Sequence, residues 1–324
     1  MIIIGKKKRL PAPSIVLDTY WQFAAERQEI FFNKFNKTDI LTEDPILLKY
    51  KFTNAYRASD RVSQYLIKNV IYEGEKNIDE ILFRILLFKI FNKIETWELL
   101  KHELVEITWK DYSFNVYSKI LNDALNAKEP IYSGAYIMAS GKSSYGHLRK
   151  HENHLKLIEQ MISSHLAEKI QLSSSMETVY TYLLSYPTIG SFLAYQYTID
   201  INYSNLTNFG ESDFVVPGPG ARDGIKKCFK DFGEYSEADI IKYVTDIQEK
   251  EFNRLNIKFK DLWGRSLQLI DCQNLFCETG KYSRVAHPEI NGVSDRKRIK
   301  QIYSKKNSDI DYYYPPKWNL NIKK

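Results

Sequence analysis

The spacing of apolar side chains along this chain is helical nearly everywhere. Residues 15–35 repeat apolar positions at the interval of an amphipathic helix. Residues 78–101 are apolar on almost every side, which predicts a central helix. Further helices are expected over residues 56–70, 113–127, 148–170, 174–185, 189–199, 221–229 and 238–255. Strand patterns are confined to residues 2–4 and 131–138, so an all-α, multi-helix protein is predicted.

Composition narrows the class of protein. The chain has 324 residues, 44% of them hydrophobic and 27% charged, so it can bury a core in one large domain or two. No apolar run approaches the roughly 18 residues of a membrane span, and the apolar start is too short for a signal peptide. The three cysteines, Cys228, Cys272 and Cys277, cannot all pair, which favours a reducing cytoplasm. Cys272 and Cys277 are interpreted as buried small residues, and no cofactor is expected.

Positive charge gathers at the carboxyl-terminal end. The net charge is +6, and residues 295–324 carry nine Lys or Arg against three Asp, interleaved with tyrosine and tryptophan. Two explanations stay open: a solvated tail, or attraction to nucleic-acid phosphates. The chain is accordingly divided into a basic arm (1–14), a helical domain (15–292) and a basic, aromatic tail (293–324).

Two partial motifs do not support a function. Residues 141–143 (Gly-Lys-Ser) end like a phosphate-binding loop, but the required glycine five residues earlier is Tyr136, so no nucleotide kinase is supported. His147, His151 and His154 would share one helix face and could bind zinc. Lysine and arginine crowd the same segment and no fourth ligand is evident, so a surface helix without metal is predicted.

A more informative motif is the segment 214–221, Phe-Val-Val-Pro-Gly-Pro-Gly-Ala. Two glycines, Gly218 and Gly220, precede a short amphipathic helix, as in a helix-hairpin-helix element. Glycine lets the backbone approach a DNA phosphate, and the helix start offers free N–H groups. Positive charge is added by Arg222, Lys226 and Lys227. An ordinary helix–helix turn is the alternative.

Two predicted helices carry polar side chains where a core would have none. One face combines Asn54, Arg57, Arg61 and Gln64. Another combines Lys89, Asn92 and Thr96, with Glu95 beside them. Such groups must be paired or must line a cavity. They therefore indicate a buried salt-bridge network or the wall of an active-site pocket.

Gln196 and Asp200 lie one helical turn apart in an apolar segment. A glutamine amide can read a base edge with its donor and acceptor together. A carboxylate, costly to bury unpaired, can stabilise the positive sugar that forms when an N-glycosidic bond breaks. The alternative is that Asp200 only ends its helix.

Five segments in order resemble the helical domain of phage 5-hydroxymethyluracil DNA kinases. This domain also stands alone in the group called α-glutamyl/putrescinyl thymine pyrophosphorylases, clade two. They are FTNAYRASDRVSQYLI (52–67), RILLFKIFNKIETW (84–97), FLAYQYTIDINY (192–203), VVPGPGARDGIKKCF (215–229) and FCETGKY (276–282). The resemblance implies a relative of helix-hairpin-helix DNA glycosylases that acts on modified pyrimidines in phage DNA. Some members are amino-acid:DNA transferases, and a bacterial relative is an anti-phage glycosylase that removes glucosylated hydroxymethylcytosine. The kinase half is expected to be absent.

One departure concerns the catalytic acid. Helix-hairpin-helix glycosylases place an aspartate some twenty residues after the hairpin, where this chain offers Asp239 and Asp246 without the usual valine-aspartate context. Asp200, before the hairpin, matches the family's own motif better.

The resulting hypothesis is a helix-hairpin-helix glycosylase-like fold with a cleft between helical lobes. The protein would be a cytoplasmic DNA glycosylase in anti-phage defence, which binds double-stranded DNA, flips a bulky modified pyrimidine and excises it. The catalytic residues would be Asp200, Gln196 and Glu95. The base pocket would use Asn54, Tyr56, Arg57, Arg61, Lys89 and Asn92. DNA would be held by Gly218, Gly220, Arg222, Lys226 and Lys227.

Two other functions stay open. An amino-acid:DNA transferase acting on pyrophosphorylated hydroxymethyluracil would use Arg57, Arg61 and Lys89 to neutralise the leaving pyrophosphate. A non-catalytic DNA-binding module would use the polar helices for structure alone.

Overall fold

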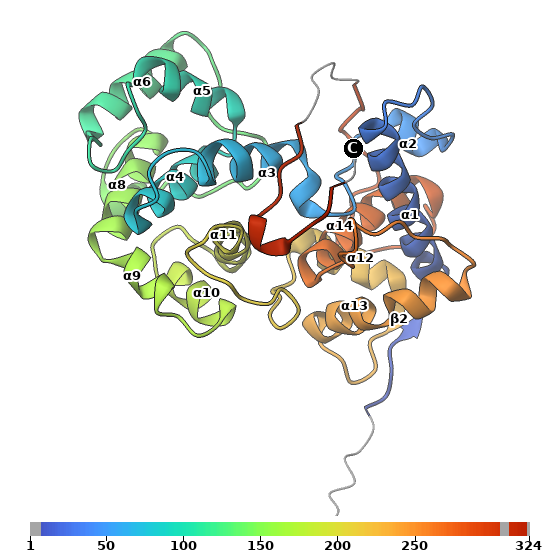
Figure 1. Ribbon diagram of the computed structural model, residues 1–324. Coiled ribbons are helices and arrows are strands. Elements are labelled where there is room, and N and C mark those ends of the chain that lie inside the picture. Colours follow the sequence, from blue (N-terminus) through green and yellow to red (C-terminus); the bar gives the residue numbers. More distant parts are fainter. Residues whose placement is uncertain (1–7, 305–310, 323–324) are drawn as a thin grey trace, which may run out of the picture. The chain divides into compact units, whose positions relative to one another are not determined.

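The computed structural model describes residues 8–304 and 311–322, and within them the chain is all-α, as its periodicity predicts. Its sheet is a single antiparallel pair in which Ala12 faces Asp231 and Pro13 faces Phe229. No helix in these residues is long and apolar enough to cross a membrane. The residues form two compact units, each described by itself (Figure 1).

The first unit combines residues 8–60, 211–304 and 319–322. In chain order its elements are β1 (Ala12–Pro13), α1 (Ile15–Phe35), α2 (Pro45–Lys49), the 3₁₀ turn η1 (Arg57–Ser59), α12 (Pro219–Cys228), β2 (Phe229–Asp231), α13 (Glu237–Arg254) and α14 (Leu269–Ala286).

The second unit combines residues 61–210 and 311–318. Its elements are α3 (Arg61–Tyr65), the π-helical η2 (Leu66–Ile71), α4 (Ile78–Phe91), α5 (Ile94–Glu103), α6 (Phe114–Asn126), α7 (Lys142–Tyr145), α8 (Lys150–Ser163), α9 (Leu166–Gln171), α10 (Met176–Leu184), α11 (Ser191–Asn202) and the 3₁₀ turn η3 (Pro316–Trp318).

The first unit is built on a very close approach of α12 to α14. A Cβ atom added at Gly224 would lie 1.8 Å from the carbonyl oxygen of Phe276. One added at Gly280 would lie 2.9 Å from the Gly224 Cα. Only glycine fits where two backbones meet at this distance, so these residues fix how the two helices pack. Helix α14 itself was not among the helices expected from periodicity.

The second unit is built around α4, in which every residue from Glu80 to Phe91 is buried. Its buried charges are hydrogen-bonded. Glu80 accepts from the amides of Trp109 and Lys110, at 2.6 and 3.0 Å. The guanidinium of Arg84 donates to backbone carbonyls of residues 70 and 75, at 2.9 and 2.8 Å. The prediction of a central helix is confirmed for this segment.

Three expected helices are interrupted, each at an identifiable residue. The 78–101 helix ends at Asn92, which adopts the left-handed conformation with φ 47°, and α5 starts afresh. The 148–170 helix breaks in the same way at His165, with φ 57°. The 56–70 helix breaks at Asp60, whose carboxylate accepts from the Asn54 amide at 2.8 Å. Local side-chain bonding and left-handed residues outweigh apolar periodicity at these points.

The strand expected over 131–138 is wrong, because these residues form bends and coil. The strand expected over 2–4 lies outside the described residues. The strands that do form are two and three residues long, too short for an alternating pattern to reveal.

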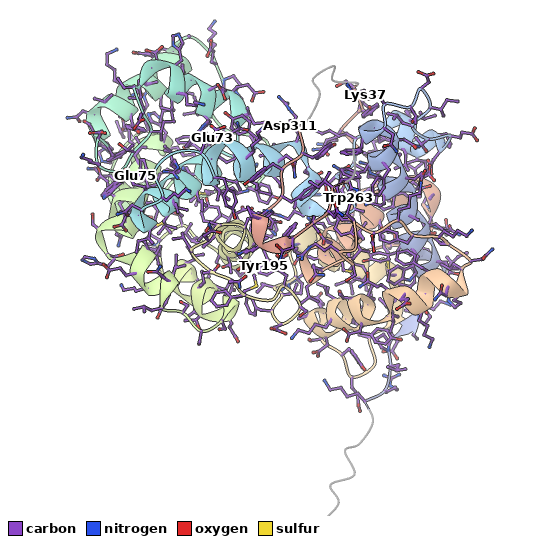
Figure 2. The ribbon with its side chains drawn as sticks, viewed as in Figure 1. Lys37, Glu73, Glu75, Tyr195, Trp263 and Asp311 are labelled. Atoms are coloured by element: carbon purple, nitrogen blue, oxygen red, sulfur yellow. The ribbon has the colours of Figure 1, made fainter. Side chains whose placement is uncertain are left out.

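Residues 311–318 of the tail fold onto the second unit. The ammonium of Lys317 donates to the carbonyl oxygens of Ser204 and Thr207, at 2.9 and 2.7 Å. Asp311 forms an ion pair with Lys68 (Figure 2). A solvated tail therefore does not describe this stretch, whereas residues 305–310 and 323–324 lie outside the described part of the chain.

Candidate functional site

The second unit contains a deeply buried ion pair. Nζ of Lys89 on α4 lies 3.0 Å from Oδ2 of Asp200 on α11, with side chains only 4% and 1% exposed. Both helices are otherwise apolar here, so the pair joins two segments that sequence analysis treated as separate polar features. Asp200 is thus a paired carboxylate rather than an isolated one.

The Lys89 ammonium has two further neighbours. It donates to Oδ1 of Asn92 at 2.9 Å and lies 4.3 Å from the centre of the Tyr136 ring. The ammonium is thus in contact with a carboxylate, an amide oxygen and an aromatic ring. The left-handed turn at Asn92 brings its amide back toward Lys89, so the break in the expected helix serves the polar site.

Residues 131–139 pack against α5 and α11, and Tyr136 among them contacts the Lys89 ammonium. The hydroxyl of Thr96 donates to the Ile131 carbonyl at 2.8 Å, and the Tyr197 hydroxyl donates to the Met138 sulfur at 3.2 Å. Burial, and then the nearby Asp200, raises the pKa of Tyr197, so its hydroxyl stays protonated and remains a donor.

The other predicted catalytic residues differ in position. Gln196 is buried on α11, one turn before Asp200. Glu95 is exposed in the first turn of α5. Arg61 begins α3 and is half-buried. The second unit therefore holds Lys89, Asn92, Gln196 and Asp200 in one interior region, and Glu95 at its surface.

Asn54, Tyr56 and Arg57 belong to the first unit. The Asn54 side chain accepts from Arg27 at 3.1 Å and donates to the Ser59 carbonyl at 2.8 Å. The Tyr56 hydroxyl donates to the Arg265 carbonyl at 2.6 Å. The predicted base-pocket residues are thus divided between the two units.

Carboxylates accompany these residues. The Arg57 amide donates to Asp271 at 2.8 Å and the Thr53 amide donates to Glu278 at 3.0 Å. Burial raises the pKa of Asp60 to about 7 and that of Asp271 to about 6, although backbone hydrogen bonds oppose both shifts. The segments 52–60 and 276–282, which carry part of the family resemblance, meet here.

The hairpin glycines have distinct positions. Gly218 is the N-cap of α12, with Pro219 in the first turn. Gly220 lies within α12, where an added Cβ would be 2.2 Å from the Cys277 sulfur. Close packing of α12 on α14 is therefore sufficient reason for glycine at position 220.

The three basic residues of α12 also differ. Arg222 pairs with Glu237 at 3.1 Å. Lys227 is buried, and its ammonium donates to the Gly280 carbonyl at 2.8 Å, so it stabilises the helix pair. Lys226 is exposed. A small basic pocket of about 210 Å³ lies here, lined by Ser14, Lys226, Lys227, Phe229, Lys230 and Ile290.

The aspartates after the hairpin have ordinary roles in the first unit. Asp239 forms a capping box with Ser236 at the start of α13, and these hydrogen bonds lower the pKa of Asp239. Asp246 is exposed on α13. Neither lies in a buried polar setting comparable to that of Asp200.

The histidine segment is not a surface helix, and that prediction is wrong. His151 and His154 are both 1% exposed on α8, whereas His147 precedes the helix. Nε2–H of His154 donates to the Ala139 carbonyl at 2.8 Å and its Nδ1 accepts from Tyr132 at 2.9 Å. Both ring nitrogens are therefore occupied.

Metal ligands do not gather elsewhere in the described residues, in which no cluster of three or more His, Cys, Asp or Glu could hold a metal ion. Burial raises the pKa of Cys272 and of Cys277 to about 12 each, which disfavours the thiolate that metals require.

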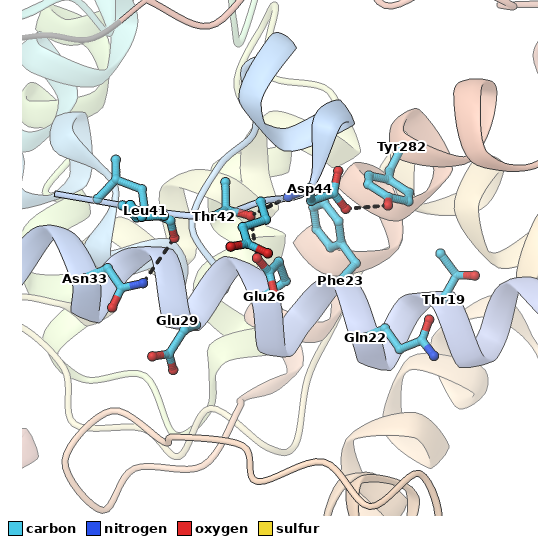
Figure 3. Close-up of a pocket in the computed structure, with 12 residues that line it drawn as sticks. Thr19, Gln22, Phe23, Glu26, Glu29, Asn33, Leu41, Thr42, Asp44 and Tyr282 are labelled. Carbon is cyan, nitrogen blue, oxygen red and sulfur yellow. Dashed lines mark hydrogen bonds between the residues drawn. The ribbon is translucent and has the colours of Figure 1, made fainter. Parts of the chain in front are cut away.

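An acidic pocket of about 470 Å³ was not anticipated from the sequence (Figure 3). It lies between α1 and residues 40–44 and contains four carboxylates, those of Glu26, Glu29, Glu43 and Asp44. Asp44 accepts from the Tyr282 hydroxyl at 2.6 Å. Its acids are spread over two segments with no periodic signal, so the chain folding alone brings them together.

Comparison with known proteins gives these features a family context. Residues 14–292 match the model of the family described as "5-hmdU DNA kinase, helical domain". The chain belongs to this family. The matched helical-domain region contains the Lys89–Asp200 pair, the 52–60 and 276–282 segments and the hairpin.

A relative of this helical-domain chain is the 5-hmdU DNA kinase of Bacillus phage SP10. The two are 27% identical over 94% of this chain and 50% of the relative, so the chain spans about half the relative's length. No solved structure matches it. The helix-hairpin-helix glycosylase type and the cleft between lobes stay predictions.

The buried pair generates a prediction about stability. Asp200→Asn or Lys89→Met alone leaves one buried charge without its counter-ion, at an expected cost of about 3–5 kcal/mol in unfolding free energy. The double variant should lose clearly less than the sum, measured by urea denaturation. Asp123→Asn, which removes an exposed ion pair with Lys119, is the control and should unfold like the parent. Strictly additive losses would contradict an energetically coupled pair.

A second prediction concerns pH. Burial lowers the pKa of His154 from 6.5 to about 4, so the unfolded chain takes up the proton first as pH falls. The neutral ring makes its full contribution to the unfolding free energy above pH 6.5. This contribution, about 3 kcal/mol in total, is lost as the pH falls from 6.5 to about 4. His154→Gln should flatten the pH dependence of unfolding free energy in this range. An unchanged slope in His154→Gln, or an equal flattening in exposed His102→Gln, would refute the assignment.

Proposed function

We propose that this chain acts on modified pyrimidines in DNA and cleaves the N-glycosidic bond of the modified nucleotide. The observation that carries the proposal is a carboxylate, Asp200, held in an apolar interior by Lys89 and preceded one turn earlier by buried Gln196. Family membership supports DNA as the substrate, because the phage relative is a 5-hmdU DNA kinase.

The proposed chemistry uses the charge of Asp200. As the bond between the sugar C1′ and the base nitrogen breaks, its electron pair leaves with the base and positive charge develops on the sugar. A preorganised carboxylate stabilises that charge only as it forms, which lowers the barrier. Water then adds to C1′ and releases a proton. The ammonium of Lys89, 3.0 Å away, favours the ionised carboxylate and fixes its position.

Base recognition would come from Gln196, whose amide offers both a donor and an acceptor to a pyrimidine edge. Asn54, Tyr56 and Arg57 remain proposed pocket residues in the first unit. Hydrolysis of a bulky base from phage DNA would serve anti-phage defence, and a site built for modified pyrimidines would equally serve hypermodification.

Group transfer is the second candidate. The phage relative is named as a kinase of 5-hmdU DNA, which favours chemistry at the base substituent. In the proposed transfer, an amino acid's amine would form a bond to the hydroxymethyl carbon, pyrophosphate would leave with the electron pair of the C–O bond, and the amine would lose a proton. Lys89 and Arg61, both in the second unit, would neutralise the leaving group.

The deciding experiment incubates the protein with three duplexes, containing glucosylated hydroxymethylcytosine, hydroxymethyluracil and its pyrophosphorylated form, the last with and without amino acids. Abasic sites indicate a glycosylase, and a mass gain of the base indicates a transferase. Asp200→Asn should lower glycosylase turnover on the order of a hundredfold, assayed well below its melting temperature. Asp123→Asn should be normal. Full activity of the folded Asp200→Asn variant would show that the ion pair has a structural role and no role in catalysis.

DNA contact is proposed at Lys226, an exposed lysine on α12 that lines the basic pocket. Lys226→Gln should weaken binding to any duplex and reduce the slope of log K against log salt by about one unit. Lys226→Gln changes the charge without disturbing the packing of α12, whereas a side chain at position 220 would collide with Cys277. Lys260→Gln, an exposed lysine paired with Glu29, is the matched control. Equal salt slopes in both variants would place the DNA surface elsewhere.

A further inference from the structure

The Lys89–Asp200 pair is closed to a substrate as it stands. Asp200 is 0% exposed and Lys89 is 3% exposed. A nucleotide cannot reach either group unless part of the surrounding chain moves. Access therefore requires a covering segment whose displacement has a small free-energy cost.

Residues 133–139 form part of that cover, because Tyr136 contacts Lys89. They lie outside regular helix or strand, and Gly134, Ala135 and Ile137 are exposed, Ile137 to 74%. The segment is held at its ends. The Asn92 amide donates to the Ser133 hydroxyl at 3.3 Å, and the Ala139 carbonyl accepts from His154 at 2.8 Å.

Tyr136 lies between these two ends and differs from its exposed neighbours. Its ring is 4.3 Å from the Lys89 ammonium and parallel to Phe192, with centroids 5.8 Å apart and planes 8° apart. Its φ of 56° is left-handed, a conformation that is unfavourable for a bulky side chain. The contacts of the ring thus hold the backbone in a strained state.

Four other left-handed residues belong to the same unit, Asn92, Lys128, His165 and Thr188, and two of them adjoin the helices of the ion pair. Asn92, which accepts from Lys89, has φ 47°, and Thr188, in the turn before α11, has φ 68°. Left-handed backbone is especially unfavourable for a β-branched residue such as Thr188.

We infer that Tyr136 is a positioning residue whose ring is a displaceable cover over Lys89 and Asp200, and that the pyrimidine takes its place. The inference rests on the proposed function. A pyrimidine is flat like the phenol ring, and its carbonyl oxygens can accept the N–H groups that Tyr136 faces. Displacing Tyr136 also relieves its left-handed backbone, which offsets part of the cost of opening.

Acetylation of lysines by acetic anhydride, followed by mass spectrometry of peptides, tests the cover without requiring any chemistry on DNA. In the parent protein Lys89 should react far more slowly than exposed Lys119. Tyr136→Ala should raise the Lys89 rate by about tenfold or more, since the site no longer needs to open. Tyr136→Phe keeps the ring and should restore the parent rate. Ile137→Ala, at the exposed neighbour, should leave the rate unchanged.

Three outcomes would overturn the inference: an unchanged Lys89 rate in folded Tyr136→Ala, an equal increase in Ile137→Ala, or failure of Tyr136→Phe to restore protection. If alanine prevents folding, Tyr136→Gly removes the ring and tolerates the left-handed backbone, and the same rates are expected.

A second experiment measures the Lys89 rate with duplexes that contain or lack 5-hydroxymethyluracil. In Tyr136→Ala, only the modified duplex should lower the Lys89 rate again, because the pyrimidine then occupies the place of the ring. If Tyr136→Ala exposes Lys89 but the protein neither excises nor modifies the base, the proposed function is refuted. The inference that Tyr136 covers Lys89 would still hold.

Discussion

A single buried electrostatic contact organises the second unit. Lys89 and Asp200 are buried on two helices of this unit, and each charge would be strongly unfavourable there without the other. Their pairing fixes the rotation of α4 against α11, requires a left-handed residue at Asn92 to supply another acceptor, and sets residues 131–139 across the top. The end of α4 at Asn92 and the ring of Tyr136 both contact this one ammonium.

Sequence reasoning recovered this site in pieces. It found Lys89 and Asn92 because polar residues interrupt an apolar helix, and Asp200 for the same reason. It could not pair them, since periodicity reports only which face of one helix is polar and not which helix it meets. Tyr136 was overlooked, because its role depends on a backbone conformation that the sequence does not announce.

The same limit explains the fold. Long amphipathic helices such as α1 follow from apolar spacing alone, whereas the breaks at Asn92, His165 and Asp60 depend on local hydrogen bonds and left-handed residues. Helix α14 went unnoticed because its role is to approach α12 through small residues, which weakens the apolar signal. Lys227 was expected at a DNA surface for its charge, yet a carbonyl of α14 accepts its ammonium.

The glycine contact between α12 and α14 couples two properties that would otherwise vary independently. Helix α12 carries Lys226 and the hairpin end, while α14 carries Asp271 and Glu278, which hold the backbone of residues 53–57. Because the backbones touch at Gly224 and Gly280, the helices cannot slide or rotate separately. Substitutions in the two helices are therefore constrained together. A change that shifts α14, and with it the contacts of Asp271 and Glu278, also displaces the hairpin. In the same way, Lys226 on α12 cannot be moved without disturbing the core between the two helices.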